Sequence, residues 1–384
     1  MNNQRRTYDF ESRQRFCAAV SKRGKLQFRA YVPGDETGIH SLCQHVFGST
    51  SSPEEWRWRN VQNPAGKTII IVAQEESGRI IGHLAGVATD LKVSNSFRKA
   101  FFLVDSAVDP SRQGRGVHAA LTFEMSRITC DQESGFGFGL PNEHAYLPTL
   151  NLGAQRVLTV PLFIKVLDWQ KVIHSRVGSD FLARIAGGFA QLFQRSKPTQ
   201  KPNGLHVSEV YRFEKEADTL WRRIASRFPV CPLRNATVLN WRYFERPNSP
   251  YRVFSVSKKD EWQGYVVIRT LEKWGLRLGT VIDLFFDPDS AEAGMLLIGT
   301  AETELRKQGA VALWGLFSVP ESYRKLFRRA GFFKTLRKRS DRPFHLLVDF
   351  VSLEYMRPEL SRRDSPLLIQ GGKWFLSLGD TDIA

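Results

Sequence analysis

The sequence VDPSRQGRGVH at residues 108–118 decides the fold, because it joins an apolar run at 101–108 to a helical pattern at 119–128. Gly114 and Gly116 allow a ligand to approach the main chain, and they tolerate the unusual φ values of a tight loop. The amides of residues 114–118 are then expected to converge at a helix N-terminus, where unpaired N–H groups and the helix dipole attract phosphate. This pattern predicts a pyrophosphate-binding turn.

The turn resembles the acyl-CoA signature of the GNAT superfamily, the GCN5-related N-acetyltransferases, which is written Q/R-x-x-G-x-G/A. Gln113 and Gly116 match this signature, and His118 stands where the family has Gly or Ala. Residues 103–110 are similar to the family's fourth strand, and Asn142 and Gly153 fit the spacing of its N-x10-G element. The glycines alone would also suit an ordinary strand–loop–helix connection. The three parts occur in the family's order, which favours the resemblance.

Composition indicates a globular protein of two or three domains, with 384 residues, 42% apolar and 24% charged. No apolar run reaches the roughly 18 residues of a membrane-spanning helix, and the first residues lack the apolar region of a secretory signal. The four cysteines, at positions 17, 43, 130 and 231, show no C-x-x-C spacing. Reduced cysteines are therefore expected, without a disulfide or zinc framework. These features predict a cytoplasmic protein with no metal site.

The chain is strongly basic, with 55 Lys and Arg against 39 Asp and Glu, a formal charge of +16. Such a charge favours anionic partners, namely CoA, nucleic acid, acidic lipid or acidic sugar, and does not choose among them. The densest basic segment, 324–342, is interpreted either as a solvated face or as an anion-docking surface. No nucleic-acid reading module is visible, so no specific nucleic-acid partner is predicted. Peripheral association with an anionic surface stays open.

Two halves of the sequence repeat one pattern. Trp58-Arg59 recurs as Trp241-Arg242, each followed by a proline at the same distance. The motif at Asp105 recurs at Asp283, and Gly153 and Gly331 follow these aspartates at equal distances. We therefore expect two copies of one domain. The predicted divisions are an N-terminal extension at 1–25, an acyl-CoA-binding domain at 26–170, a bridging helix and linker at 171–204, and a second domain at 205–384.

Each copy shows an order of strands and helices that predicts an α/β (α+β) fold. The expected strands are 26–31, 68–74, 79–88, 99–108 and 136–140 in the first copy, and 252–257, 262–271, 279–286 and 312–317 in the second. The expected helices are 35–47, 119–128 and 293–309. Together with the resemblance, this order implies two tandem GNAT-like domains, each a mixed, mostly antiparallel twisted sheet flanked by helices.

The second copy has lost the features of the turn. Residues 289–293 read DSAEA, with no glycine and with two carboxylates where a pyrophosphate would lie. At ~4 Å and an effective dielectric constant of ~20, one like-charge contact costs about 4 kcal/mol before screening. We expect the second domain to have a degenerate cofactor loop and to have kept the scaffold.

The resemblance also implies how the acyl donor is held. In the family, a main-chain amide of the fourth strand meets the thioester carbonyl, which places Val108 or its neighbours there. Asn142 is expected to contact the cofactor arm. The predicted cofactor-binding residues are Val108, Gln113, Gly114, Arg115, Gly116, Val117, His118 and Asn142. The expected donor is acetyl-CoA, used as a substrate.

The acid and base are less directly indicated. Family enzymes often place a tyrosine acid seven residues after that asparagine, where this chain has Thr149. A threonine is a poor proton donor, so Tyr146, one helical turn earlier, is the predicted acid. Asp105 on the fourth strand is the predicted base, and Glu143 and His144 are alternatives. The recurrence of Asp105 as Asp283 in the degenerate half also favours a structural role for both.

These inferences predict an enzyme, an acyl-CoA-dependent N-acyltransferase that moves an acetyl group from acetyl-CoA to an amine. Residues 142–146 (NEHAY) and the double-domain layout resemble acetyltransferase-like proteins of bacterial surface-polysaccharide pathways, which implies an amino sugar as acceptor. Fem-type aminoacyl transferases also pair two GNAT folds, but they need no CoA turn. A non-catalytic acyl-CoA sensor or scaffold is a further alternative, supported by Thr149.

Overall fold

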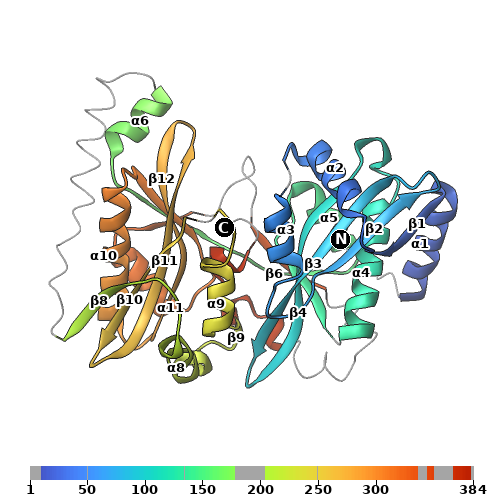
Figure 1. Cartoon of the computed structure of the whole chain (residues 1–384). Helices are drawn as coiled ribbons and strands as arrows, with labels where there is room; N and C mark the ends of the chain where they lie inside the picture. Colours follow the sequence, from blue (N-terminus) through green and yellow to red (C-terminus); the bar gives the residue numbers. More distant parts are fainter. Residues whose placement is uncertain are drawn as a thin grey trace, which may run out of the picture. The chain divides into compact units, whose positions relative to one another are not determined.

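The computed structural model describes residues 10–49, 51–133, 135–177, 204–248, 250–335, 344–349 and 366–381. The chain divides into two compact units (Figure 1). Unit 1 comprises residues 1–159 and 341–371, and unit 2 comprises residues 160–340 and 372–384. The predicted bridge at 171–204 lies outside the described residues from 178 to 203, so that part of the prediction stays untested.

Unit 1 is built on one mixed sheet with helices packed against it. Its helices are α1 (Phe10–Gly24), α2 (Glu36–Phe47), α3 (Pro53–Asn60), α4 (Val117–Glu133) and α5 (Glu143–Asn151), with a short 3-10 turn η1 (Pro110–Arg112). Its strands are β1 (Leu26–Ala30), β2 (Ile69–Glu75), β3 (Ile80–Val93), β4 (Ser96–Val108), β5 (Phe136–Gly139), β6 (Gln155–Thr159) and β15 (His345–Val348). They follow the order β1-β2-β3-β4-β5-β15-β6.

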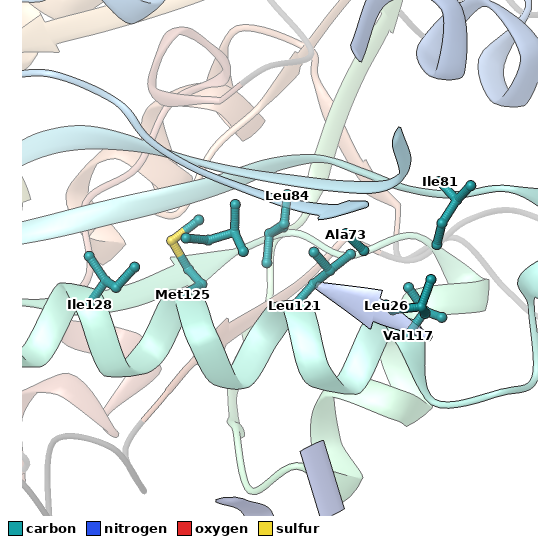
Figure 2. Close-up of a cluster of buried hydrophobic side chains, with 9 residues drawn as sticks. Leu26, Ala73, Ile81, Leu84, Val117, Leu121, Met125 and Ile128 are labelled. Carbon is teal, nitrogen blue, oxygen red and sulfur yellow. The ribbon is translucent and has the colours of Figure 1, made fainter. Parts of the chain in front are cut away.

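The core of unit 1 lies between α4 and the sheet. Val117, Leu121, Met125 and Ile128 recur along one face of α4 and pack against strand residues that include Leu84 (Figure 2). Gly82 on β3 allows this close approach, because a Cβ atom there would lie 3.1 Å from side-chain atoms of both Val117 and Leu121. The packing therefore fixes the first turn of α4, where the predicted ligand turn ends.

The helix α3 carries Arg59 and Asn60 at its C-terminal end. It begins at a capping box, in which Ser52 Oγ accepts from the amide of Glu55 at 3.2 Å and the Glu55 carboxylate accepts from the amide of Ser52. Trp58 is buried, and Arg59 and Asn60 complete the helix. The buried tryptophan anchors this turn against the unit.

A β-bulge interrupts the pairing of β3 with β4. His83 pairs with Ala107 and Ala85 with Val104, so two residues of β4, Asp105 and Ser106, oppose the single Leu84. Asp105 has a φ of 51°, in the left-handed region that non-glycine residues rarely adopt. Bulges of this kind occur next to active sites, where they redirect side chains.

Unit 2 repeats the plan with its own sheet. Its helices are α6 (Trp169–Val177), α8 (Lys215–Ile224), α9 (Ala236–Tyr243), α10 (Ala291–Lys307) and α11 (Glu321–Arg329), with 3-10 turns η2 (Ala225–Arg227) and η4 (Leu378–Asp380). Its strands are β7 (Leu162–Val166), β8 (Leu205–Val210), β9 (Val230–Pro232), β10 (Arg252–Lys258), β11 (Glu261–Lys273), β12 (Leu276–Phe286), β13 (Ala312–Leu316) and β14 (Phe333–Thr335). The 3-10 turn η3 (Gly371–Lys373) spans the division between the units.

The two sheets share their central arrangement. The second sheet has the order β14-β7-β13-β12-β11-β10-β8. In each sheet, a long antiparallel hairpin, β3–β4 or β11–β12, is followed by one parallel pair, β4–β5 or β12–β13. A helix, α4 or α10, connects the strands of each parallel pair. This confirms the predicted fold class of two mixed, mostly antiparallel sheets flanked by helices.

The boundaries of the units differ from the predicted divisions at 170 and 205. The strand β7 pairs with β13 and β14 in the sheet of unit 2. Conversely, β15 pairs with β5 and β6 in the sheet of unit 1. The predicted domains were continuous, whereas each compact unit takes a short segment from the other half of the chain. The predicted extension at 1–25 also contains α1, which packs against α4 and β1 in unit 1.

Candidate active site

The turn between β4 and α4 presents a row of unpaired main-chain amides. Gly114 and Gly116 have φ values of 71° and 85°. The amides of Arg112 and Gln113 donate within the turn, and the amide of Ala120 donates to the Gly116 carbonyl oxygen at 3.1 Å. Between them, no amide from Gly114 to Ala119 donates to another described residue. These donors lie at a helix N-terminus, where phosphate binds most readily.

Side chains of β2 and η1, and of the residues just before β3 and η1, hold the base of the turn. Asp109 Oδ1 accepts from the amide of Ser111 at 2.9 Å and from its hydroxyl at 2.6 Å. Ion pairs join Asp109 to Arg79 and Arg112 to Glu75. The Ser111 hydroxyl contributes most to lowering the pKa of Asp109. The carboxylate therefore stays ionised and keeps the strand end in a fixed relation to the helix start.

The predicted cofactor residues of the turn differ in what they offer a ligand. Gln113, Gly114 and Arg115 are exposed, and nothing lies within 4 Å of a Cβ atom built on Gly114. The side-chain nitrogen Nε2 of Gln113 donates to the Val108 carbonyl oxygen at 3.1 Å, so part of this side chain is already hydrogen-bonded within the turn. Val117 is buried in the core and can offer only its main chain.

Gly116 is closed on its side-chain face by α1. A Cβ atom there would lie 2.9 Å from both Phe16 Cζ and Val20 Cγ2. Only glycine therefore allows α1 to pack against the start of α4. Gly114 leaves the main-chain amides open to a ligand, and Gly116 leaves room for Phe16 and Val20 of α1.

Beyond the turn, β4 has a free edge. Its parallel pairing with β5 runs only from Ala100 to Phe102. The remaining residues to Val108 have no partner on that side among the described strands, although β3 pairs with them on the other side. An extended ligand can add to such an edge through main-chain hydrogen bonds. The family resemblance implies a main-chain contact of this kind between the fourth strand and the acyl donor.

His118 links β4 to α5. Its Nδ1 atom lies 3.0 Å from Ser106 Oγ, and its Nε2 atom lies 3.4 Å from Thr149 Oγ1. Burial lowers the pKa of His118, which favours a neutral ring. Thr149, at the position where the family often has a tyrosine, therefore lies beside a histidine that the sequence placed at the cofactor. This proximity was not predicted.

The segment that begins at Asn142 caps a helix. Asn142 Oδ1 accepts from the amide of Ala145 at 2.9 Å and is the N-cap of α5, so this oxygen is not free for the cofactor. The Tyr146 ring packs on the His345 ring, with centroids 4.5 Å apart. The side chains of Glu143 and His144 are largely exposed. No hydrogen bond within the described residues joins Tyr146 to Asp105 or to the turn.

Asp105 lies at the bulge and contacts two other elements. Its carboxylate forms an ion pair with Arg59 of α3, and the two side chains are 28% and 21% exposed. Its carbonyl oxygen lies 2.9 Å from Nδ1 of His83. The carboxylate of Asp105, the predicted base, is therefore already paired with the Arg59 guanidinium.

Comparison with known families agrees with this geometry. A family model described as an acetyltransferase (GNAT) domain matches residues 27–150, which span β1 to α5 and include the turn. Residues 27–150 are therefore similar to a GNAT acetyltransferase domain. The match confirms the predicted recognition and supports the prediction of an acyltransferase enzyme. No curated protein matches this sequence.

Solved structures resemble most of the chain. A probable N-acyltransferase from Enterococcus faecalis has a TM-score of 0.59 and 10% identity, with 86% of this chain and 74% of that chain covered. A GCN5-related N-acetyltransferase from Anabaena variabilis has a TM-score of 0.59 and 10% identity, with 85% and 73% covered. Saccharomyces cerevisiae N-myristoyltransferase with bound myristoyl-CoA has a TM-score of 0.55 and 12% identity, with 84% and 82% covered. At these identities the likeness shows the fold alone.

Unit 2 lacks the counterpart of the GNAT turn. Its loop between β12 and α10 has no positive-φ residue from Asp287 to Ala293. Asp289 forms an ion pair with Arg227, and Glu292 lies in the first turn of α10. Asp283 is fully buried, where it meets Arg234 and the hydroxyls of Tyr243 and Tyr265. These contacts fit the predicted degenerate loop.

Sequence reasoning missed the polar residues around Asp105 in the GNAT domain. Arg59, Asn60 and His83 were not predicted as site residues, although Trp58-Arg59 was singled out as a repeat. His83 follows Gly82, whose counterpart in the second half is Gly264. The available signal was the position of Asn60 and His83 within these repeats, because their counterparts Tyr243 and Tyr265 contact Asp283. None of the described helices is long and apolar enough to cross a bilayer.

Proposed function

We propose that this protein is an N-acyltransferase that moves an acyl group from acyl-CoA to an amine. The observation that carries the proposal is the row of unpaired amides from Gly114 to Ala119, open at Gly114 and placed at the start of α4. A diphosphate bound there gains main-chain hydrogen bonds and the favourable end of the helix dipole. The basic charge of the chain adds a long-range attraction for CoA.

The donor is proposed to extend from the turn along the free edge of β4. Val108 and its neighbours supply main-chain groups to the pantetheine arm and to the thioester carbonyl. The phosphates are surrounded by the residues of the turn, namely Gln113, Gly114, Arg115, Gly116, Val117 and His118. Asn142 contacts the pantetheine arm through its side-chain amide nitrogen. Acetyl-CoA is the proposed donor. Comparing the rate of transfer from acetyl-CoA with the rate from a long-chain acyl-CoA tests this donor preference.

The proposed acceptor is an amine, with an amino sugar as the first choice. Asp105 and Tyr146 are the proposed residues for proton transfer. Asp105 has support from its place at the bulge, beside the free edge of β4. Tyr146 lies on α5, one turn before Thr149, and its ring is half-buried against His345. A role in surface-polysaccharide synthesis rests on the resemblance of residues 142–146 and of the double-domain layout.

Thiol release with a panel of amines tests the proposal. The protein is incubated with acetyl-CoA and one primary amine at a time, with glucosamine among them, and the product mass is measured. We expect CoA release that depends on the amine and a product that carries one acetyl group. Turnover of no amine, despite tight acyl-CoA binding, would contradict the enzyme proposal.

A non-catalytic acyl-CoA sensor is the second candidate. Thr149 supports it, because no tyrosine acid occupies that position. Binding without turnover distinguishes the sensor from the enzyme. Fem-like aminoacyl transfer has less support, since that reaction does not need the amide turn.

A further inference from the structure

Buried polar side-chain atoms on α2, α3 and β3, the elements that contact β4 and Asp105, have no hydrogen-bond partners among the described residues. They are Nε2 of His83, Nε2 of His40, Nε of Arg59, and both side-chain atoms of Asn60. His83 is 2% exposed and Asn60 is 5% exposed. Buried polar groups are nearly always paired with protein, water or ligand, and an unpaired one costs about 1–3 kcal/mol. So many in one place indicate a binding site.

The hydrogen bond of His83 fixes which of its nitrogens is basic. Nδ1 lies 2.9 Å from the carbonyl oxygen of Asp105, and a carbonyl oxygen only accepts. Nδ1 therefore carries the hydrogen, and Nε2 carries the lone pair in the neutral ring. His83 adjoins Leu84, which faces α4, so by strand alternation its ring points to the opposite face. That face also holds α2, with His40.

Unit 2 fills the equivalent place with larger side chains. Asn60 corresponds to Tyr243, His83 to Tyr265 and Asp105 to Asp283, by the repeats at Trp58, Gly82 and Asp105. The hydroxyls of Tyr243 and Tyr265 both lie 3.1 Å from Oδ2 of Asp283. By this correspondence we expect Asn60 and His83 to face a common centre in unit 1. There the side chains are shorter, and their polar atoms are left unpaired.

We infer that Nε2 of His83 is the base that deprotonates the acceptor amine, and that the Asn60 carboxamide binds an uncharged polar group of the same acceptor. The inference rests on the proposed acyltransferase function. His83 then takes the place of Asp105 as the proposed base, and Asp105 becomes a positioning residue, because its carbonyl oxygen holds the His83 tautomer. A carboxamide with both a donor and an acceptor unpaired suits a hydroxyl or amide group. The acceptor is therefore a primary amine with a nearby hydroxyl or amide.

The proposed step balances as follows. His83 Nε2 takes one proton from the ammonium form of the acceptor, directly or through one water, and the ring becomes imidazolium. The freed amine lone pair attacks the thioester carbonyl carbon, the C–N bond forms and the C–S bond breaks. The second amine proton passes to the departing CoA sulfur. The products are the amide and CoA thiol, and His83 releases its proton to solvent.

The charged and titratable groups near His83 suit a neutral base. Burial lowers its pKa below the ordinary value of 6.5, while Asp105 raises it and Arg59 and His40 lower it. The nearby Cys43 on α2 is no rival nucleophile, because burial raises its pKa to about 12 and keeps it a thiol. The lowered pKa keeps His83 neutral at neutral pH, with the lone pair on Nε2.

The test replaces His83 with asparagine. In H83N the amide nitrogen can still donate to the Asp105 carbonyl, but no basic nitrogen remains. We expect kcat to fall by about 10²–10⁴-fold, the usual contribution of a general base. Wild-type kcat should fall at acidic pH with an apparent pKa below 6.5, and H83N should lose this limb. Acetyl-CoA affinity, measured by calorimetry, should stay near wild type.

The control is H45N, which changes an exposed histidine on α2. It should keep both rate and pH profile. An active wild type with an H83N variant that retains its rate and its acidic limb would overturn the base assignment alone. A wild type that transfers to no amine would overturn the proposed function and, with it, this inference.

Asn60 is tested by the near-isosteric variant N60L with glucosamine and with cyclohexylamine, which lacks hydroxyls. We expect KM for glucosamine to rise about tenfold or more, which corresponds to one lost hydrogen bond to a buried group of about 1.4 kcal/mol. The KM for cyclohexylamine should not rise. Equal changes for both amines, or none for glucosamine, would overturn the role of Asn60.

Discussion

Asp105 and Asp283 hold equivalent places in the two repeats, yet the Asp105 side chain is 28% exposed and that of Asp283 is fully buried. Asp283 is surrounded by Arg234 and by two tyrosine hydroxyls. Asp105 meets Arg59 and leaves neighbouring polar atoms unpaired. The equivalent aspartates therefore differ in role: Asp283 is part of the buried core of unit 2, and Asp105 borders the candidate site of unit 1.

This contrast predicts different stability costs for the two aspartates. D283A should destabilise unit 2 by about 3–5 kcal/mol, because it leaves the buried Arg234 guanidinium without this partner. D105N should cost about 1 kcal/mol or less, since asparagine also tolerates the positive φ at this position and the ion pair with Arg59 is partly exposed. Denaturant unfolding of each variant measures the difference. Similar losses for both would contradict the contrast.

Gly116 and Gly114 should also respond differently to alanine. Both have positive φ, which costs alanine about 1–2 kcal/mol. At Gly116 the new methyl group would also meet Phe16 and Val20, and overpacking adds about 1–3 kcal/mol. G116A should therefore lose more stability than G114A in denaturant unfolding. The double variant G116A/F16A should recover part of that loss, and an unchanged loss would argue against the contact with α1.

Asp109 should contribute stability that depends on pH. Its folded pKa is lowered, chiefly by the Ser111 hydroxyl. The contribution is therefore fully present above the unfolded pKa of about 3.9, and it is lost as pH falls through the lower folded value. At pH 7, D109A should cost about 1 kcal/mol, as for a lost cap. The gap between wild type and D109A, measured by urea unfolding, should shrink below pH 4, and a constant gap would contradict the assignment.

Much of the fold could be predicted, because its signals are local. The strand before residue 108, the glycines of the turn and the periodicity of α4 lie within one short stretch. The repeats at Trp58 and Asp105 then extended the assignment to the second half. Even the N-cap role of Asn142 had a signal, since asparagine before Glu143 is a common helix start.

The parts that were missed depend on distant contacts. The short strands β7 and β15 pair with residues far away in sequence, so nothing near them indicates which sheet they join. The bulge at Asp105 is a matter of register between β3 and β4, which a sequence pattern does not fix. A single histidine in an apolar strand, His83, carries no sign of its unpaired nitrogen.

The central claim is that the amides from Gly114 to Ala119 bind the diphosphate of acyl-CoA. Calorimetric titration of acetyl-CoA into G114N and G114D tests it most directly. Both residues tolerate positive φ, and the side chains have nearly the same shape, so only the charge differs. One like charge at ~4 Å costs about 4 kcal/mol before screening at an effective dielectric constant of ~20. We predict that G114D binds acetyl-CoA at least about tenfold more weakly than G114N, with the difference reduced by salt. Equal affinities of G114N and G114D, or no binding by the wild type, would contradict the account.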